Sequence, residues 1–215
     1  MSISNHFNGQ VLTSDQQELL MELERFLETK RAPVFLLKGY AGTGKSFVMS
    51  GVTKYLGWLG KELVIVAPTG KAAKVIASKT KHKASTIHRV IYKFYEKDEE
   101  PKNEYLPRKP DSYSYLNQNN DEPDTIYIVD ESSMISDRFS TSEIGKFGSG
   151  YLLQDLLEYI DFKNNPKRKV IFIGDNAQLP PIRNFYSPAR NERVLRGVYK
   201  RYCQSFELTE VGRQR

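Results

Sequence analysis

The chain reads GYAGTGKS at residues 39–46, and the fold class can be inferred from this segment and its flanks. An apolar run, PVFLL (33–37), precedes it, and a segment that we expect to be helical (45–58) follows it. Glycines at 39, 42 and 44 let the backbone turn tightly, so successive N–H groups can point inward at an anion. The helix adds the positive end of its dipole. Strand, glycine-rich turn and helix in this order predict a loop that binds phosphate groups.

The loop fills every fixed position of the pattern G-x-x-x-x-G-K-[ST]. We expect Lys45 to reach the β- and γ-phosphates of a nucleotide and the Ser46 hydroxyl to coordinate Mg²⁺. The alternative, a glycine-rich turn that only caps a helix, is disfavoured by the correct flanking elements. The predicted nucleotide-binding residues are Gly39, Tyr40, Ala41, Gly42, Thr43, Gly44, Lys45 and Ser46.

A second motif, TIYIVDESSM (125–134), is an apolar strand that ends in two adjacent carboxylates. Side chains alternate along a strand, so the two groups can have different roles. Asp130 is expected to hold Mg²⁺, and Glu131 to orient and deprotonate the attacking water. The alternative is a strand that ends in an aspartate capping a helix.

A third motif, KVIFIGD (169–175), runs into NAQLPPI. Gln178 lies between this strand and a rigid Pro180-Pro181 corner, where its amide could reach a γ-phosphate and report its presence. Ordinary turn chemistry is the alternative for Asp175 and Gln178.

Strands and helices are expected to alternate along the chain. Residues 13–30 have apolar spacing typical of an amphipathic helix, opened by a Thr13-x-x-Gln16 capping box. The strands are continuous apolar runs, as expected when helices cover both sheet faces. We therefore predict an α/β fold with a doubly wound, largely parallel sheet. Strands are expected over 33–38, 62–67, 125–129, 169–174 and 205–209, and further helices over 45–58, 70–78, 85–95 and 151–160.

Residues 93–124 interrupt this alternation with prolines, a Gln-Asn-Asn tract and several tyrosines. A stretch of this length inside a compact domain indicates an inserted subdomain or mobile loop. The tyrosines and Phe94 could stack on bases or separate strands, or they could pack a small subdomain.

Composition limits the class of protein. Of 215 residues, 39% are hydrophobic and 27% charged, which excludes wholesale disorder. The longest apolar runs are too short to span a bilayer, and the start of the chain lacks the features of a signal peptide. One cysteine, Cys203, cannot form an internal disulfide. We expect a cytoplasmic protein with no membrane partner.

The formal net charge is +6, and it is segregated along the chain. Basic residues dominate 61–83 and 183–201, whereas 93–124 is acidic. Such segregation fits a nucleic-acid surface or merely solvated faces. Pro68, Thr69 and Gly70 leave an expected strand and enter a helix that carries Lys71. Backbone N–H groups and a hydroxyl there suit a phosphate of single-stranded DNA.

Together the motifs resemble those of superfamily 1 DNA helicases, and their sequences are most similar to those of the RecD/Dda-like 5′-to-3′ branch. The resemblance spans residues 12–214 and implies a RecA-like ATPase core over 1–215, the first half of a helicase motor. It implies hydrolysis of ATP with Mg²⁺, coupled to movement on single-stranded DNA and unwinding at junctions with duplex. The motifs, in chain order, are GYAGTGKS, APTGKAA (67–73), STIH (85–88), DESSM (130–134), GDNAQLPPI (174–182) and LTEVGRQ (208–214).

The resemblance also implies roles for single residues. Gln16, in LTSDQ, would recognise adenine, and Arg213 would contact the γ-phosphate beside Lys45, Glu131 and Gln178. Thr86 and His88 would contact DNA, although His88 fits a buried imidazole equally well.

The chain ends at Arg215, whereas the family has a second RecA-like domain that closes the ATP cleft and supplies another arginine finger. We therefore expect a fragment of low activity. Two other functions fit a phosphate-binding loop. One is a nucleotide-gated switch or binding module without unwinding activity. The other is a nucleotide kinase, which the Gln178 and LTEVGRQ motifs disfavour.

Overall fold

The computed structural model describes residues 2–7, 9–94, 113–140, 146–175, 177–181 and 184–211. Within these residues, six strands form one sheet in the order β3-β2-β6-β8-β1-β9, and every neighbouring pair is parallel. The predicted doubly wound α/β fold is confirmed, with a sheet that is wholly parallel in the described part. The strands are β1 (Val34–Gly39), β2 (Leu63–Ala67), β3 (Ala84–Thr86), β6 (Ile126–Val129), β8 (Lys169–Asp175) and β9 (Cys203–Leu208).

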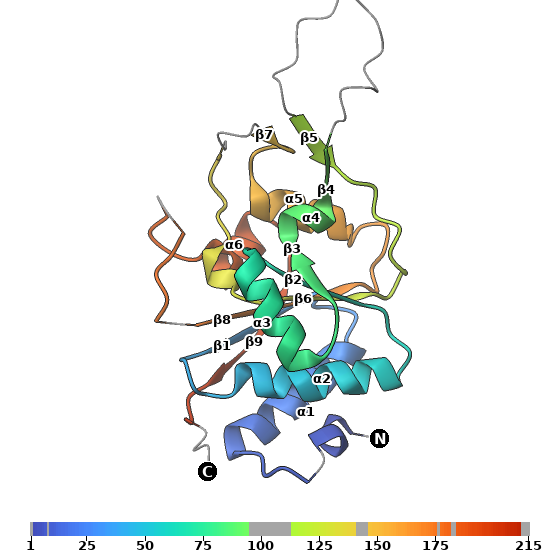
Figure 1. Ribbon diagram of the computed structural model, residues 1–215, viewed down its shortest axis with the longest axis vertical. Coiled ribbons are helices and arrows are strands. Elements are labelled where there is room, and N and C mark those ends of the chain that lie inside the picture. The colour runs from blue at the N-terminus through green and yellow to red at the C-terminus, as the bar shows by residue number, and fades with distance from the viewer. Residues whose placement is uncertain are drawn as a thin grey trace, which may run out of the picture.

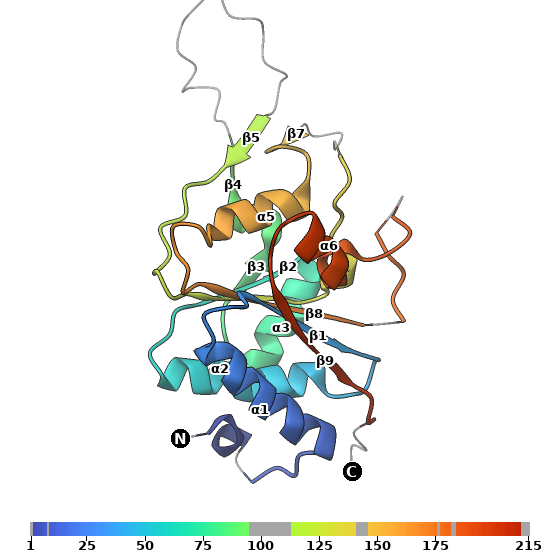
Figure 2. The same cartoon turned by 180° about the vertical axis from the view of Figure 1, so that it is seen from behind.

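Helices cover both faces of this sheet (Figures 1 and 2). One face packs against the 3₁₀ helix η1 (Ile3–Phe7), α1 (Ser14–Glu28), α2 (Lys45–Trp58) and α3 (Gly70–Thr80). The other packs against α4 (Ile87–Ile91), α5 (Leu152–Ile160), α6 (Glu192–Gly197) and the 3₁₀ helix η4 (Pro188–Arg190). No helix in the described ranges has the length and apolar character needed to cross a bilayer.

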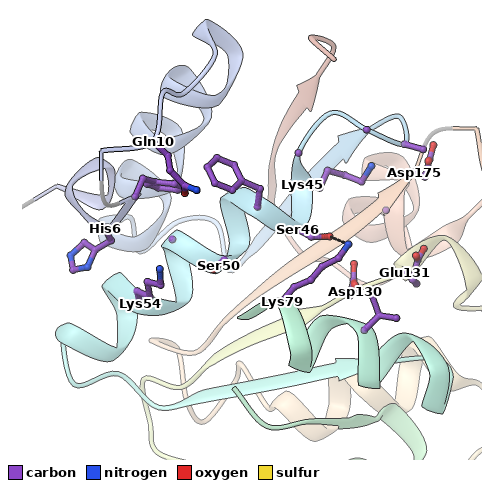
Figure 3. A pocket seen from close by; sticks show the side chains of 18 of the residues that line it. His6, Gln10, Lys45, Ser46, Ser50, Lys54, Lys79, Asp130, Glu131 and Asp175 are labelled. Carbon is purple, nitrogen blue, oxygen red and sulfur yellow. Dashed lines mark hydrogen bonds between the residues drawn. The ribbon is translucent and has the colours of Figure 1, made fainter. Parts of the chain in front are cut away.

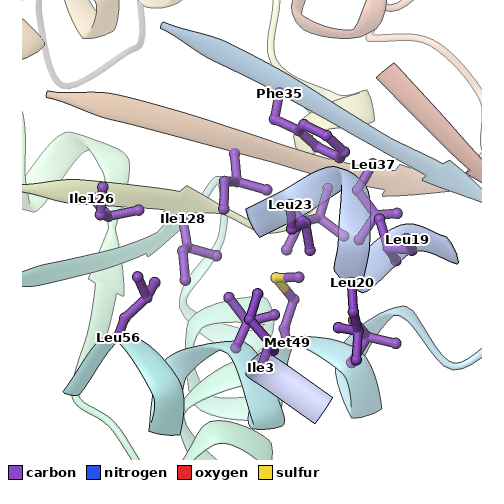
Figure 4. Packing of buried hydrophobic residues seen from close by; sticks show 14 of the residues in the cluster. Ile3, Leu19, Leu20, Leu23, Phe35, Leu37, Met49, Leu56, Ile126 and Ile128 are labelled. Atoms are coloured by element: carbon purple, nitrogen blue, oxygen red, sulfur yellow. The ribbon is translucent and has the colours of Figure 1, made fainter. Parts of the chain in front are cut away.

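The four central strands, β1, β2, β6 and β8, are largely apolar because each contributes side chains to two cores. On β1, Phe35 and Leu37 face the α1–α2 side, while Val34 and Leu36 face the α5 side. Leu23 of α1 and Met49 of α2 complete the first core beneath the sheet (Figure 4). Side chains that alternate between two covered faces are all buried, which explains why the sequence shows no polar alternation.

Ile128 lies in this first core on β6, with no exposed side-chain surface. We expect Ile128→Ala to lower the free energy of unfolding by about 2–5 kcal/mol, because it removes buried methyl groups and leaves a cavity. Met21→Ala, on the exposed side of α1, is the control. Denaturant titration of both variants measures the difference, and equal losses would contradict the assignment of Ile128 to the core.

The amphipathic helix expected over 13–30 is α1, and its capping box is present. The Gln16 backbone N–H donates to Thr13 Oγ1 at 3.3 Å, and the Thr13 N–H donates to Gln16 Oε1 at 3.1 Å. The helix expected over 85–95 is shorter than predicted, because α4 ends at Ile91 and the chain then turns into a strand.

That strand belongs to a small second sheet, which lies beyond α4 and α5 (Figure 1). It contains β4 (Tyr92–Phe94), β5 (Tyr113–Leu116) and β7 (Lys146–Phe147), with β4 antiparallel and β7 parallel to β5. The Tyr92 hydroxyl ties it to α5 by donating to Asp155 Oδ2 at 2.6 Å. The described parts of the predicted insertion, 93–94 and 113–124, thus include two of these strands. Residues 95–112 lie outside the described part of the chain.

Candidate nucleotide-binding site

A cavity of about 690 Å³ lies at the carboxyl edge of the main sheet. The glycine-rich loop after β1 and the first turns of α2 form its floor, and the ends of β6 and β8 bring in acidic side chains (Figure 3). Helix α3 and the N-terminal segment close other sides. Because carboxyl ends of parallel strands share one edge, motifs far apart in sequence meet here. Predicted site residues that line the cavity are Ala41, Gly42, Gly44, Lys45, Ser46, Asp130, Glu131 and Gln178.

The loop adopts a conformation that requires glycine. Gly42 and Gly44 have φ angles of +83° and +88°, which other residues rarely adopt. A Cβ on Gly44 would also lie 2.5 Å from the side-chain amide of Gln16. Thr43 is buried beneath the loop, where its hydroxyl donates to the Tyr40 carbonyl at 2.9 Å, and the Tyr40 side chain is half exposed. Gly39, Tyr40 and Thr43, all predicted to bind nucleotide, are not among the residues that line the cavity.

The Lys45 ammonium is held by the loop itself. It donates to the carbonyl oxygens of Gly39 at 2.8 Å and Tyr40 at 2.7 Å. Burial lowers the pKa of Lys45, and the nearby carboxylates of Asp175 and Glu131 oppose that shift. A cation beside a glycine-rich loop at the start of a helix suits a polyphosphate.

The paired carboxylates after β6 lie opposite Lys45. Burial, followed by the charge of neighbouring Glu131, raises the pKa of Asp130 to about 6, and Lys79 and Lys45 partly offset this. The Asp130 backbone continues the sheet, because its N–H donates to the Val66 carbonyl at 2.9 Å. Glu131 then turns with φ +51° and ψ +35°, a left-handed conformation that is uncommon for a non-glycine residue and clusters at functional sites.

Two serines of DESSM hold this turn against β8. Ser132 Oγ donates to the Ile173 carbonyl at 2.8 Å, and Ser133 Oγ donates to Gln178 Oε1. Gln178 is therefore positioned by the same segment that carries Glu131. The sequence motif contained both serines, but nothing in their spacing indicated this role.

Gln16 lies behind the loop, with 4% of its surface exposed. Its Oε1 accepts from the Thr13 N–H, and its Nε2 donates to the Thr43 carbonyl at 3.4 Å. Its side-chain amide thus joins the start of α1 to the loop, directly behind Gly44 of the cavity lining. Arg213 lies outside the described residues.

The cavity is also lined by residues that the sequence interpretation did not include. Among them are His6, Phe7 and Gln10 from the N-terminal segment, and Lys79 from α3. The Phe7 ring packs 5.2 Å from the Phe47 ring, over Gly51, where a Cβ would clash with it. A glycine inside a helix is a signal of such close packing, and Gly51 could have indicated that something covers α2.

The predicted DNA-binding residues gather at the same edge of the sheet. Strands β2 and β3 pair with Ala67 opposite Thr86, which places residues 68–71 beside residues 86–88. The Thr69 hydroxyl caps α3 by accepting from the Ala72 N–H, and the Thr86 hydroxyl caps α4 by accepting from the Arg89 N–H. Both threonines thus have a structural role in addition to the predicted one.

His88 is half-buried against two aromatic rings, 5.6 Å from Tyr92 and 5.1 Å from Phe147 between ring centroids. Burial lowers its pKa. This environment favours the interpretation of His88 as a packed imidazole over a direct contact with DNA.

The basic 183–201 segment is only partly a solvated helix face. Arg193 and Arg196 are exposed on α6. Arg190 instead points inward, where its guanidinium donates to the carbonyl oxygen of Asp175 beside the cavity.

Residues 11–215 match the sequence family described as AAA domain. The chain belongs to the AAA domain family. This AAA domain is 31% identical over 147 residues to an ATP-dependent RecD2 DNA helicase of Deinococcus radiodurans, a match covering 68% of the chain and 16% of that protein. It is 26% identical over 188 residues to an uncharacterized protein, R530, of Acanthamoeba polyphaga mimivirus, covering 80% of the chain and 34% of that protein.

Among solved structures, the AAA domain is similar to the Pif1 helicase of Candida albicans. The TM-score is 0.53 at 16% identity, covering 95% of the chain and 41% of that structure. This likeness shows a shared fold. These matches confirm the predicted resemblance to superfamily 1, RecD-like helicases and the predicted RecA-like fold. The chain spans about a sixth and a third of the length of the two curated relatives.

Proposed function

We propose that this AAA domain binds and hydrolyses ATP with Mg²⁺ and couples hydrolysis to movement along single-stranded DNA. One observation supports this most: the cavity brings Lys45, Ser46 and the two carboxylates together from separate elements. A loop that binds phosphate, a metal-binding pair and a general base are the parts that phosphoryl transfer to water needs. The kinship with RecD2 and the Pif1-like fold support a helicase motor over other phosphate-binding domains.

The Ser46 hydroxyl and the Asp130 carboxylate face the same cavity, and such oxygen donors fit Mg²⁺. Bound there, the ion would neutralise charge on the phosphate oxygens. Lys45 would shift from the loop carbonyls to the phosphates, and the Glu131 carboxylate would accept a proton from the attacking water. Gln178 would sense the γ-phosphate from the cavity rim, Gln16 is proposed to act near adenine, and Arg213 near the γ-phosphate.

The proposed DNA track begins at the N-terminus of α3. The backbone N–H groups of Gly70 and Lys71 lie in its first turn, and Lys71 is exposed beside them. Pro68, Thr69 and Thr86 complete this track in the proposal. His88, predicted to contact DNA, would instead support the track by packing against Tyr92 and Phe147. From the similarity to RecD-like helicases we infer that the domain acts at junctions with duplex DNA, moves 5′ to 3′ and unwinds the duplex. Unwinding assays on duplexes with either a 5′ or a 3′ single-stranded tail test the direction.

Steady-state phosphate release, with and without a single-stranded oligonucleotide, tests the function. A motor domain is expected to hydrolyse ATP faster when DNA is bound, even if the rate of this chain is low. A nucleotide-gated switch predicts no change, so equal rates at saturating oligonucleotide would contradict the proposal.

Lys71→Ala is expected to weaken binding of single-stranded DNA several-fold and to reduce the slope of log affinity against log salt by about 0.7, because one phosphate contact is lost. Fluorescence anisotropy of a labelled oligonucleotide at several salt concentrations measures both. Lys163→Ala, an exposed lysine beyond α5, is the control. An unchanged slope in Lys71→Ala would place the DNA elsewhere.

A further inference from the structure

Lys79, in the last turn of α3, points into the nucleotide cavity. Its Nζ donates to Ser46 Oγ at 3.2 Å, and Asp130 lies beside it (Figure 3). The Lys79 side chain is exposed to solvent, so its ammonium has room to move away from Ser46. The hydroxyl that it contacts is the one proposed to bind the metal.

The charges around Lys79 explain why an ammonium lies there. Asp130, Glu131 and Asp175 all line the cavity. The Lys45 ammonium is held by two loop carbonyls on the other side. Lys79 therefore supplies positive charge on the Asp130 side, and its charge lowers the pKa of that carboxyl against the effects of burial and Glu131.

A metal ion bound to Ser46 and Asp130 would need the oxygen that Lys79 now contacts. Two cations at this position also repel each other. The ammonium and the metal are thus alternative partners of the same hydroxyl.

We propose that Lys79 is a resident counter-ion of the metal position, which contacts Ser46 and balances Asp130 before nucleotide binds and is displaced when magnesium nucleotide enters. This inference rests on the proposed nucleotide site. It has a specific consequence. Without a divalent ion, the Lys79 ammonium stays beside Ser46 and attracts the phosphates of the nucleotide. With Mg²⁺ present, the ammonium competes with the metal ion for the Ser46 hydroxyl. Lys79 therefore reduces the gain in nucleotide affinity that Mg²⁺ produces.

The test is a titration of the chain with a non-hydrolysable ATP analogue, in EDTA and over a range of Mg²⁺ concentrations, followed by calorimetry. Lys79→Met removes the charge and the donor but keeps the length and helix propensity of the side chain. Lys79→Arg keeps the charge. Lys74→Met, an exposed lysine of the same helix outside the cavity lining, is the matched control, and thermal unfolding checks that all variants fold.

In Lys79→Met, we expect the affinity for the nucleotide analogue in EDTA to fall about three- to tenfold, the effect of one partly screened charge. The Mg²⁺ concentration that gives half of the maximal increase in affinity should fall by a similar factor. The ratio of affinities with and without Mg²⁺ thus rises, while Lys79→Arg and Lys74→Met behave as the wild type.

An equal loss of affinity with and without Mg²⁺ would make Lys79 a direct phosphate contact and overturn the inference. So would a Lys79→Met variant identical to wild type. In either case, the proposal of the nucleotide site itself would still stand, provided that the wild type binds the nucleotide analogue. Absence of nucleotide binding by the wild type would overturn both.

Discussion

Replacement of Glu131 by glutamine is expected to lower the rate of ATP hydrolysis by about 10²- to 10⁴-fold, the usual contribution of a general base. Glutamine keeps the size of the side chain and cannot accept the proton. Nucleotide affinity is expected to change little, because Lys45 and the loop N–H groups are intact. Phosphate release measures the rate, and calorimetry with a non-hydrolysable analogue measures the affinity.

Asp130→Asn is the matched comparison, since it changes the adjacent carboxylate in the same way. We expect it to raise the Mg²⁺ concentration required for nucleotide binding, whereas Glu131→Gln leaves that requirement unchanged. Identical responses of the two variants to Mg²⁺ would show that the division of roles between the carboxylates is wrong.

Lys45→Ala is expected to weaken binding of magnesium ATP about 10- to 100-fold, the loss typical of a hydrogen bond to a charged group. The fold should be unaffected, because within the described residues the Lys45 ammonium donates its hydrogen bonds to carbonyls of its own loop. Lys45→Arg tests whether the shape of the cation matters as well as its charge. We expect it to weaken binding too, because a planar guanidinium does not replace a compact ammonium. Unchanged affinity in Lys45→Ala would place the nucleotide in another part of the molecule.

The elements that the sequence predicted well carry strong local signals. The helix from Lys45 to Trp58 was expected over the same residues, and the glycine-rich loop that precedes it marks its start. The capping box fixed the start of α1 in the same way. Asp130, Glu131 and Gln178 were expected near the phosphates because of their proposed roles in metal binding, water activation and γ-phosphate sensing, and the cavity contains all three.

What the sequence did not predict depends on contacts between distant segments. Strands β4, β5 and β7 have two to four residues each, too few for a periodic pattern. The N-terminal helix η1 exists because Ile3 and Phe7 pack against α1 and α2. Lys79 reaches Ser46 only because α3 packs beside α2, which spacing along one helix cannot show.

The position of β1 within the sheet has a consequence for synthesis on the ribosome. Its two neighbours are β8, which begins at Lys169, and β9, which begins at Cys203. At about 5–20 residues per second, β1 would wait on the order of ten seconds with both edges unpaired. Exposed apolar strand edges are prone to aggregation, so we expect nascent chains that stop before β8 to depend on chaperones, and the nucleotide loop to take shape only late in translation.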